Sequence, residues 1–407
     1  MKVFYRLFII IFFLSILVGV IAYARGYRVD FEKKTFTPTG ILAISSWPKA
    51  AKIYINNELK GVTDTNLSLP PGSYKVEIRK EGYTSWSKSV TLKGELVISL
   101  DGLLFPNNPS LSPLTNLGII KVVPIDQTEK ILLFSDNNNA EKDGVYLFET
   151  NKKPLSFLPP LKLIIKKSEF PTDIIFKDTN IYVSSDYKQA IFETTPQNAY
   201  LSNKTAYLLS LEEENKKLFD ITNSKDTFLE AWETDKQVLN VKILETYPKD
   251  IAKIASDSFR IISFSPDETK FVYSPNLNLS LPLVIEPPMI STNQTPEQRT
   301  VQKDSIYVYD RKEDKNYLLS SDSSSLISNN YFLWYSDSKH FVSIDTNGSR
   351  KGGISIMDYD GLNKQTIYSG PYENNFFTTT SEGKVIVLVN LNPEANLLPD
   401  LYLVGIK

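Results

Sequence analysis

The sequence predicts an almost entirely β protein behind one apolar N-terminal helix. The 407 residues include 22 Tyr and 22 Phe among many Ser, Thr, Asn, Val and Ile, a composition that favours strands joined by turns. Short stretches alternate apolar and polar residues, the period of half-buried strands. A turn-and-strand pattern also recurs in the C-terminal two thirds of the chain. This length is too great for one compact domain, so we expect two or three.

The apolar run from Leu7 to Ala24 follows Lys2 and Arg6. At about 1.5 Å of rise per residue, it nearly matches a hydrocarbon core of about 30 Å. We expect residues 7–24 to be an uncleaved signal anchor with residues 1–6 in the cytoplasm. The alternative is a cleaved signal peptide, because Ala22-Tyr23-Ala24 has the small-x-small spacing of a cleavage site.

Composition narrows the function classes. With 45 basic and 47 acidic residues the chain offers no broad attraction for nucleic acid. The absence of cysteine removes disulfides, thiolate nucleophiles and thiolate metal sites. The single histidine, His340, is expected to be a partly exposed strand residue rather than a general base. The oxygen-rich stretch from Asp136 to Gly144 could hold Ca²⁺, but its spacing does not fit the EF-hand loop, and we expect a solvated hairpin loop. We therefore expect no cofactor, no metal site and no enzymatic activity.

The first domain is expected over residues 40–102, after a stalk at residues 25–39. Apolar residues alternate there with polar ones, and turns follow at Asn56-Asn57, Pro70-Pro71-Gly72 and Glu81-Gly82. This pattern predicts a small antiparallel sandwich.

Motifs in this segment resemble those of the PEGA domain, a surface β-module named for a Pro-Glu-Gly-Ala turn. The motifs are Trp47-Pro48-Lys49-Ala50-Ala51, Gly61-Val62-Thr63-Asp64, Leu69-Pro70-Pro71-Gly72-Ser73-Tyr74 and Glu81-Gly82-Tyr83. The sequence departs from the family at the naming turn, where Lys49-Ala50 replace Glu-Gly, and at Asp64, where Pro is usual.

Residues 103–116 are expected to be a proline-containing linker, and residues 117–407 to be a β-propeller. The segments Phe264–Val272 and Trp334–Val342 align with Asp267 over Asp337. Weaker copies centre on Asp126, Asp186, Asp235 and Ser381. The spacing predicts about six blades, with five or seven also compatible.

The Ser-Pro-Asp turn at Ser265-Pro266-Asp267 and the turn at Asp358-Tyr359-Asp360-Gly361 resemble the blade repeats of TolB-like propellers. The order of anchor, PEGA-like sandwich and propeller resembles PEGA-domain membrane proteins of bacteria. That resemblance implies that both modules lie outside the membrane.

Two groups of residues are binding candidates. Trp47, Tyr83 and Trp86 could form an exposed stacking surface for sugars or a peptide, although a small sandwich usually buries such rings in its core. The second group lies in a long insertion between Ser274 and Asp304 and contains Leu281, Leu283, Ile285 and Met289. This insertion either folds over its own propeller face or docks another envelope protein.

The sequence thus predicts a single-pass envelope protein that binds a cell-wall glycan or a protein partner without catalysis. One alternative is a propeller-type hydrolase acting on envelope glycan or peptide, which would need convergent carboxylates at the propeller axis. The recurring aspartates instead occupy equivalent turn positions, as structural residues would. A further alternative is a cleaved, secreted binding protein.

Overall fold

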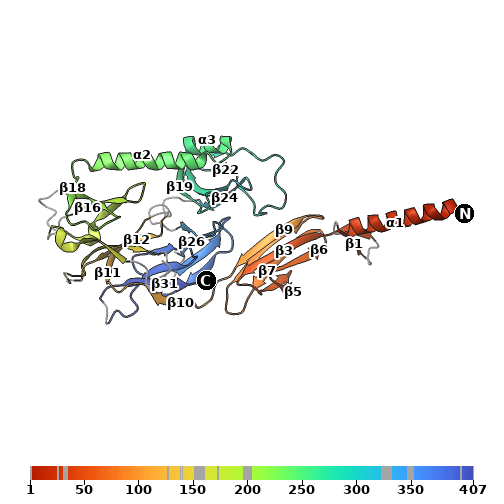
Figure 1. The fold of residues 1–407 in the computed structure, drawn as a ribbon, viewed down its shortest axis with the longest axis horizontal. Coiled ribbons are helices and arrows are strands. Elements are labelled where there is room, and N and C mark those ends of the chain that lie inside the picture. The colour runs from red at the N-terminus through yellow and green to blue at the C-terminus, as the bar shows by residue number, and fades with distance from the viewer. Residues whose placement is uncertain are drawn as a thin grey trace. The chain divides into compact units, whose positions relative to one another are not determined.

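The computed structural model describes residues 2–24, 27–30, 35–125, 128–137, 139, 141–150, 161–171, 174–195, 204–321, 332–345, 353–394 and 397–406. The chain divides into two compact units. Unit 1 contains Met1–Asn107 and a distant segment, Ile285–Pro296, and unit 2 contains Asn108–Val284 and Glu297–Lys407. The labelled elements of both units are drawn in Figure 1.

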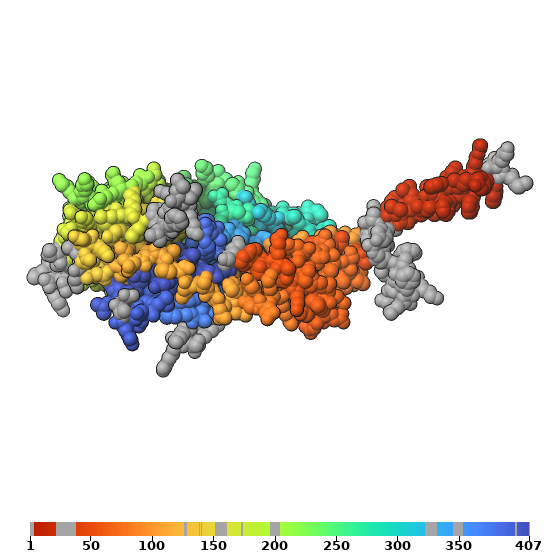
Figure 2. Space-filling model, turned by 60° about the horizontal axis from the view of Figure 1, so that its bottom comes forward, coloured from red at the N-terminus to blue at the C-terminus, as the bar shows by residue number. Residues whose placement is uncertain are grey.

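Unit 1 begins with helix α1 (Lys2–Ala24), whose window Phe4–Ile21 is strongly apolar and has no buried residue (Figure 2, red). This helix fits either a single-pass membrane anchor or a signal peptide. After it, β1 (Tyr27–Asp30) pairs antiparallel with β2 (Thr35–Pro38). The predicted stalk therefore includes a two-stranded ribbon.

The rest of unit 1 contains the predicted sandwich, built from a three-stranded and a four-stranded sheet. The first has the order β6-β3-β9 and the second the order β5-β4-β7-β8. The strands are β3 (Gly40–Trp47), β4 (Lys52–Ile55), β5 (Glu58–Val62), β6 (Thr65–Leu69), β7 (Gly72–Arg79), β8 (Ser85–Leu92) and β9 (Val97–Leu103). Every second residue of β3 is buried, so the alternation in the sequence places one face of each sheet in a shared core.

Unit 2 contains five four-stranded antiparallel sheets among its described residues. The first four consist of β11 (Ile119–Ile125), β12 (Lys130–Ser135), β13 (Gly144–Glu149), β14 (Leu161–Lys166); β15 (Asn180–Val183), β16 (Gln189–Thr194), β17 (Thr205–Ser210), β18 (Phe219–Asp220); β19 (Phe259–Phe264), β20 (Lys270–Pro275), β23 (Ile306–Asp310), β24 (Lys315–Ser320); and β25 (Phe332–Trp334), β26 (His340–Asp345), β27 (Gly353–Asp358), β28 (Gln365–Tyr368). Two short 3-10 helices, η1 (Lys167–Glu169) and η2 (Phe176–Asp178), lie between β14 and β15.

The fifth sheet joins the two ends of unit 2. It combines β29 (Phe377–Thr379), β30 (Val385–Val389) and β31 (Asp400–Gly405) with β10 (Ser110–Pro113). β10 pairs antiparallel with β31 from Ser110↔Gly405 to Pro113↔Tyr402. A first strand that completes the last sheet is a connectivity that closes propellers, so the propeller prediction is confirmed.

The predicted range of five to seven blades holds, but the best count of six is corrected to five within the described residues. The expected copy around Asp235 lies in helix α2 (Lys225–Leu244), which is followed by α3 (Lys249–Ser258). The α2 sequence contains no Gly or Pro and is rich in Leu, Lys and Glu, which favour a helix over a strand. The copy around Asp126 lies outside the described residues.

The two helices lie between the second and third sheets, where a further blade was expected. Phe228, Leu229 and Trp232 of α2 pack against buried residues of the β15–β18 sheet. Leu244 at the end of α2, Tyr247 and Ile251 pack against the sheet that begins with β19. Figure 1 shows α2 extending between β16–β18 and the α3–β19 region. The hairpin therefore covers sheet faces that a blade would otherwise cover.

Candidate functional site

The prediction that Trp86 belongs to an exposed aromatic surface is wrong, because Trp86 is 3% exposed and lies in the core of the sandwich. Tyr83 is half-buried and packs against the same core. Trp47 is half-buried at the end of β3. A sandwich of this size needs its largest rings to fill the core, so the three do not form one exposed stacking face.

The insertion between the third sheet's strands divides into buried and exposed parts. Leu281 is 4% exposed and lies in the core with Val301, so its predicted role in docking is wrong. Ile285 is half-buried, whereas Leu283 and Met289 are 48% and 49% exposed. Ile290 was not among the predicted binding residues, and it is 69% exposed.

The base of the insertion is a closed neck in unit 2. Its short strands β21 (Leu279–Ser280) and β22 (Thr300–Val301) pair with each other. Arg299 donates to the carbonyl of Pro282 at 2.5 Å and to the carbonyl of Asp314, and its guanidinium lies 3.2 Å from the Asp314 carboxylate. The Val284 amide donates to the same carboxylate at 2.8 Å. These contacts fix where the chain leaves and re-enters the propeller.

Between the two sides of this neck, Ile285–Pro296 folds with the sandwich of unit 1, and we call this segment the strap. The Gln294 side chain accepts from the Thr91 amide at 2.6 Å and donates to the Thr91 carbonyl at 3.0 Å. The sequence predicted either a loop folded over its own propeller face or a loop that docks another envelope protein. Nothing in the local sequence signals a partner 203 residues away.

The carboxylates of the recurring turn aspartates accept hydrogen bonds from residues of the same turn. Ser184 Oγ donates to Asp186 and Ser265 Oγ to Asp267, both at 2.7 Å. The amide two residues after each aspartate also donates to its carboxylate, at 3.1 Å from Lys188, 3.2 Å from Thr269 and 2.8 Å from Lys339. The residues Tyr187, Glu268 and Ser338, which follow the aspartates, all have positive φ. The structural interpretation of these carboxylates is therefore supported.

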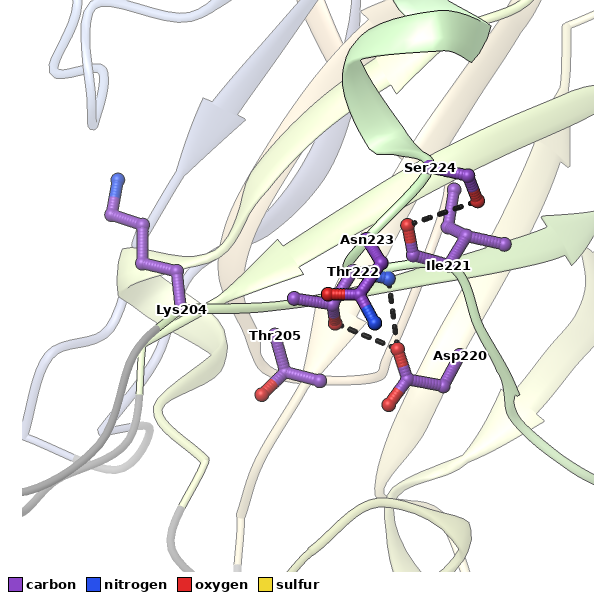
Figure 3. A pocket seen from close by; sticks show the side chains of 7 residues that line it. All are labelled: Lys204, Thr205, Asp220, Ile221, Thr222, Asn223 and Ser224. Carbon is purple, nitrogen blue, oxygen red and sulfur yellow. Dashed lines mark hydrogen bonds between the residues drawn. The ribbon is translucent and has the colours of Figure 1, made fainter.

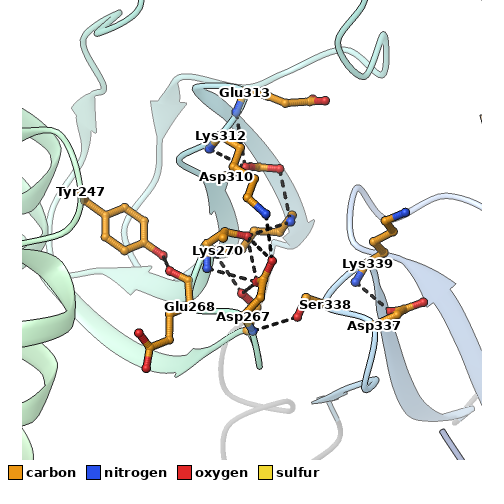
Figure 4. A network of polar contacts seen from close by, with 12 residues as sticks. Tyr247, Asp267, Glu268, Lys270, Asp310, Lys312, Glu313, Asp337, Ser338 and Lys339 are labelled. Atoms are coloured by element: carbon orange, nitrogen blue, oxygen red, sulfur yellow. Dashed lines mark hydrogen bonds and ion pairs between the residues drawn. The ribbon is translucent and has the colours of Figure 1, made fainter. Parts of the chain in front are cut away.

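Hydrogen bonds also join one turn to the next. The Asp267 amide donates to Ser338 Oγ at 3.0 Å, as Figure 4 shows. The Tyr335 hydroxyl donates to the Gly383 carbonyl at 2.6 Å, and the Ser381 amide donates to Glu129 at 2.6 Å. These three bonds link the turns of the third, fourth, fifth and first sheets in succession.

The helical hairpin continues this chain of turns. Ser185 Oγ, in the turn of the second sheet, lies 3.4 Å from its acceptor Asp235 on α2. The Tyr247 hydroxyl donates to the Glu268 carbonyl in the turn of the third sheet at 2.9 Å (Figure 4). Burial raises the pKa of Tyr247, so this hydroxyl stays a donor at neutral pH. The helices thus connect two turns as a blade would.

Removing one of these hydrogen bonds tests whether the connected turns stabilise the propeller. Tyr335→Phe is expected to lower the free energy of unfolding by about 1–2 kcal/mol, because the Tyr335 side chain is fully buried and the Gly383 carbonyl loses its donor. The matched control is Tyr74→Phe, whose hydroxyl donates to Pro70 in an exposed setting. Urea unfolding compares the two variants, and an equal, negligible loss for both would contradict the expectation.

His340 is buried, contrary to the prediction of a partly exposed residue, being 7% exposed at the start of β26. Its Nδ1 lies 2.7 Å from Asp337 Oδ2 and its Nε2 lies 3.2 Å from Asp358 Oδ1. Both ring nitrogens therefore have carboxylate partners, and the imidazole links the turn to the end of β27. With both nitrogens engaged by carboxylates, the ring is suited to a structural role.

A polar pocket of about 410 Å³ lies where β18 meets α2 (Figure 3). Asp220 accepts from the Thr222 amide at 2.8 Å and from its hydroxyl at 2.7 Å, so these groups bond to each other. Lys204 lies 3.3 Å from Glu193. Burial opposes ionisation of Glu193, but hydrogen bonds from Lys225, Asn180 and Lys204 lower its pKa to about 2. Asp220 and Lys204 of the lining are thus both bonded to other residues of the protein.

Within the residues that the structure describes, no cluster of three His, Asp or Glu side chains could hold a metal ion. In the oxygen-rich loop, the Asp143 carboxylate accepts from the amides of Asn137 at 2.7 Å and Asn139 at 2.8 Å. Asp143 is 5% exposed, and its carboxylate holds the backbone of its own loop.

The seven-stranded sandwich spans the segment that carries the turn motifs described above. Residues 39–108 match the PEGA domain family. The resemblance seen in the sequence is confirmed for this PEGA domain. No curated protein matches the chain by sequence.

Solved structures that are similar to the chain include β-propeller proteins. A protein assigned as TolB from Agrobacterium tumefaciens is 14% identical, with a TM-score of 0.20 over 64% of this chain and 65% of that one. TolB from Acinetobacter baumannii is 10% identical, with a TM-score of 0.22 over 81% and 59%. An oligogalacturonate lyase in complex with manganese is 8% identical, with a TM-score of 0.25 over 69% and 74%. The chain spans less than two thirds of both TolB structures, and the propeller assignment depends on the sheet connectivity described above.

Proposed function

We propose that this protein is a membrane-anchored scaffold that binds a protein partner of the cell envelope without catalysing a reaction. In this proposal α1 is the anchor and holds the following domains outside the cytoplasm. The PEGA domain serves as a spacer or wall-binding module, and the strap, an insertion within the propeller sequence, presents the binding surface. The observation that carries the non-enzymatic part is the composition of the strands nearest the propeller axis.

The first strand of each sheet lines the centre of a propeller with this connectivity. These five strands are β11, β15, β19, β25 and β29, and none of them contains Asp or Glu. A glycosidase needs two carboxylates facing one substrate. The turn carboxylates of Asp186, Asp267 and Asp337 already accept hydrogen bonds from their own turns. This distribution supports binding over hydrolysis.

The exposed part of the insertion supports a protein partner. Met289 and Ile290 of the strap are 49% and 69% exposed. The neck at Arg299 fixes the ends of this segment, which limits the ordering cost on binding. Apolar side chains on a fixed loop are suited to a hydrophobic pocket of another protein.

The test compares full-length protein in nanodiscs with a Met289→Ser/Ile290→Ser variant, each immobilised and exposed to solubilised cell envelope. The control variant is Leu318→Ser, which removes a side chain of similar exposure, 38%, from β24. We expect a specific protein to be retained by the wild type and the control and lost from the double variant. Equal retention by all three would overturn the docking role, and turnover of wall glycan or envelope peptides would overturn the non-enzymatic assignment.

A further inference from the structure

Strand β8 of the PEGA domain is a long and regular sheet edge. It is the last strand in the order β5-β4-β7-β8, and it pairs with β7 from Gly72↔Leu92 to Arg79↔Ser85 without a register shift. Edge strands in natural proteins are usually protected by proline, by bulges, by charges or by a covering segment. β8 contains no proline and no bulge, and its only charged residue is Lys88.

The cover on this edge is a side chain that imitates a strand. The Gln294 carboxamide both accepts from the Thr91 amide and donates to the Thr91 carbonyl. A carboxamide carries the same donor and acceptor as a peptide group, so it reproduces the two bonds that one residue of a neighbouring strand would make. Backbone groups alternate in direction along a strand, so those of Ser85 and Ser89 point to the same side as those of Thr91.

We propose that β8 accepts an extended segment of a partner protein as an added strand, and that Gln294 of the strap occupies this edge in the chain alone. This inference rests on the proposed binding function and names the class of partner. Addition of a strand to an exposed edge is a common mode of peptide recognition, with affinity from main-chain hydrogen bonds.

The side chains of β8 define what the added strand contains. Those on the outer face are hydroxyl-bearing and exposed: Ser85, Ser87, Ser89 and Thr91. On the opposite face Trp86, Val90 and Leu92 are buried in the core. Hydroxyl residues pair favourably with Ser or Thr across strands, and β-branched residues fit a pleated surface. The partner segment is therefore an alternation of threonine or serine with β-branched apolar residues.

The strap can leave the edge without unfolding the insertion. Its contact with Thr91 is made by the exposed side chain of Gln294. The neck is held separately, by Arg299, Asp314 and the pairing of β21 with β22. An incoming strand thus displaces the two hydrogen bonds between Gln294 and Thr91 and replaces them with equivalent ones.

The test uses full-length protein in nanodiscs and a fluorescein-labelled Lys-(Thr-Val)4-Lys peptide as the probe. Gln294→Ala is expected to bind the peptide about tenfold more tightly than the wild type in fluorescence anisotropy, because the edge is uncovered. Gln237→Ala, which removes an exposed glutamine from α2, serves as the matched control and is expected to behave like the wild type. Equal binding by all three proteins would overturn the proposal.

A second substitution locates the site. Ser89→Pro in the Gln294→Ala background removes an amide that points away from β7, so the β7–β8 bonds remain while the added strand loses a donor. Peptide binding is expected to be lost. Retained binding, or a concentration-dependent dimer of Gln294→Ala without peptide, would overturn the assignment to a partner segment.

Hydrogen exchange gives a readout that does not depend on the proline variant folding. The peptide is expected to slow amide exchange in β8 of Gln294→Ala, and unchanged exchange there would contradict strand addition. Because the probe is synthetic, failure of envelope capture would overturn the proposed function and leave this result standing.

Discussion

Replacing His340 with glutamine is expected to lower the free energy of unfolding by about 3 kcal/mol at neutral pH. Burial alone would lower the pKa of His340, but hydrogen bonds to Asp337 and Asp358 raise it to about 9. An ordinary histidine titrates near 6.5, so the folded state holds the proton more tightly than the unfolded state. The stabilisation is therefore complete below about pH 6.5 and is lost as the pH rises through 9.

The matched control for this experiment is His340→Lys. Lys270 occupies the equivalent position in the preceding blade, because Lys270↔Asp310 and His340↔Asp358 are corresponding pairs in the two sheets. The Lys270 ammonium lies 3.5 Å from Asp310, and both residues are buried. We expect His340→Lys to retain most of the stability of the wild type and to keep it above pH 9.

Urea unfolding at pH 6, 7.5 and 9.5 distinguishes the three proteins. The free energy of unfolding of the wild type is expected to fall between pH 7.5 and 9.5, because His340 loses its proton there. That of the glutamine variant is expected to change little over the same range. A wild type as stable at pH 9.5 as at pH 6, relative to the glutamine variant, would contradict a charged His340.

Replacing Arg299 with methionine is expected to cost about 3–5 kcal/mol, because it leaves the Asp314 carboxylate buried without its cation. The Asp314 side chain is 3% exposed and the Arg299 side chain 15%. The same change removes the hydrogen bonds that hold Pro282 and Asp314 at the neck. The insertion is therefore expected to become sensitive to proteolysis between Leu283 and Glu297.

Lys315→Met is the control for Arg299→Met. Lys315 contacts Glu297 at 3.6 Å, while Arg299 contacts the same residue at 3.0 Å. A partly exposed pair of this kind contributes about 1 kcal/mol or less. Thermal unfolding and limited thermolysin digestion measure both effects, and similar losses for the two variants would show that Arg299 does not hold the neck.

The sequence predicted those parts of the fold that depend on local patterns. Alternation predicted the sandwich strands, and the Ser-Pro-Asp turn predicted the blades, because both signals lie within about ten residues of chain. The α2–α3 hairpin was not predicted. The spacing of Asp235 from the neighbouring turns indicated a blade, whereas the helix propensity of the surrounding residues favours the observed helix. The start of a strand at His340 was predicted, but its burial was not, because one of its two carboxylate partners, Asp358, lies across a strand pair and far along the chain.

The candidate site was harder to predict for the same reason. Met289 was a binding candidate because it lies in an apolar segment of a long insertion. The partner of Gln294 is a backbone group, which any residue could supply, so the sequence does not indicate it. The burial of Leu281 and Trp86 depends on which side of a strand faces the core, and a short or interrupted alternation leaves this open.

The pairing of β10 with β31 also bears on how the protein is made. At about 5–20 residues per second, the ribosome needs roughly 15–60 s to reach β31 after it has made β10. Throughout this interval β10 lacks its pairing strand β31, while the four intervening sheets are synthesised one after another. The last blade therefore forms after synthesis has passed Tyr402, and a chain that stops short of that residue leaves Ser110–Pro113 open to pairing with other nascent strands.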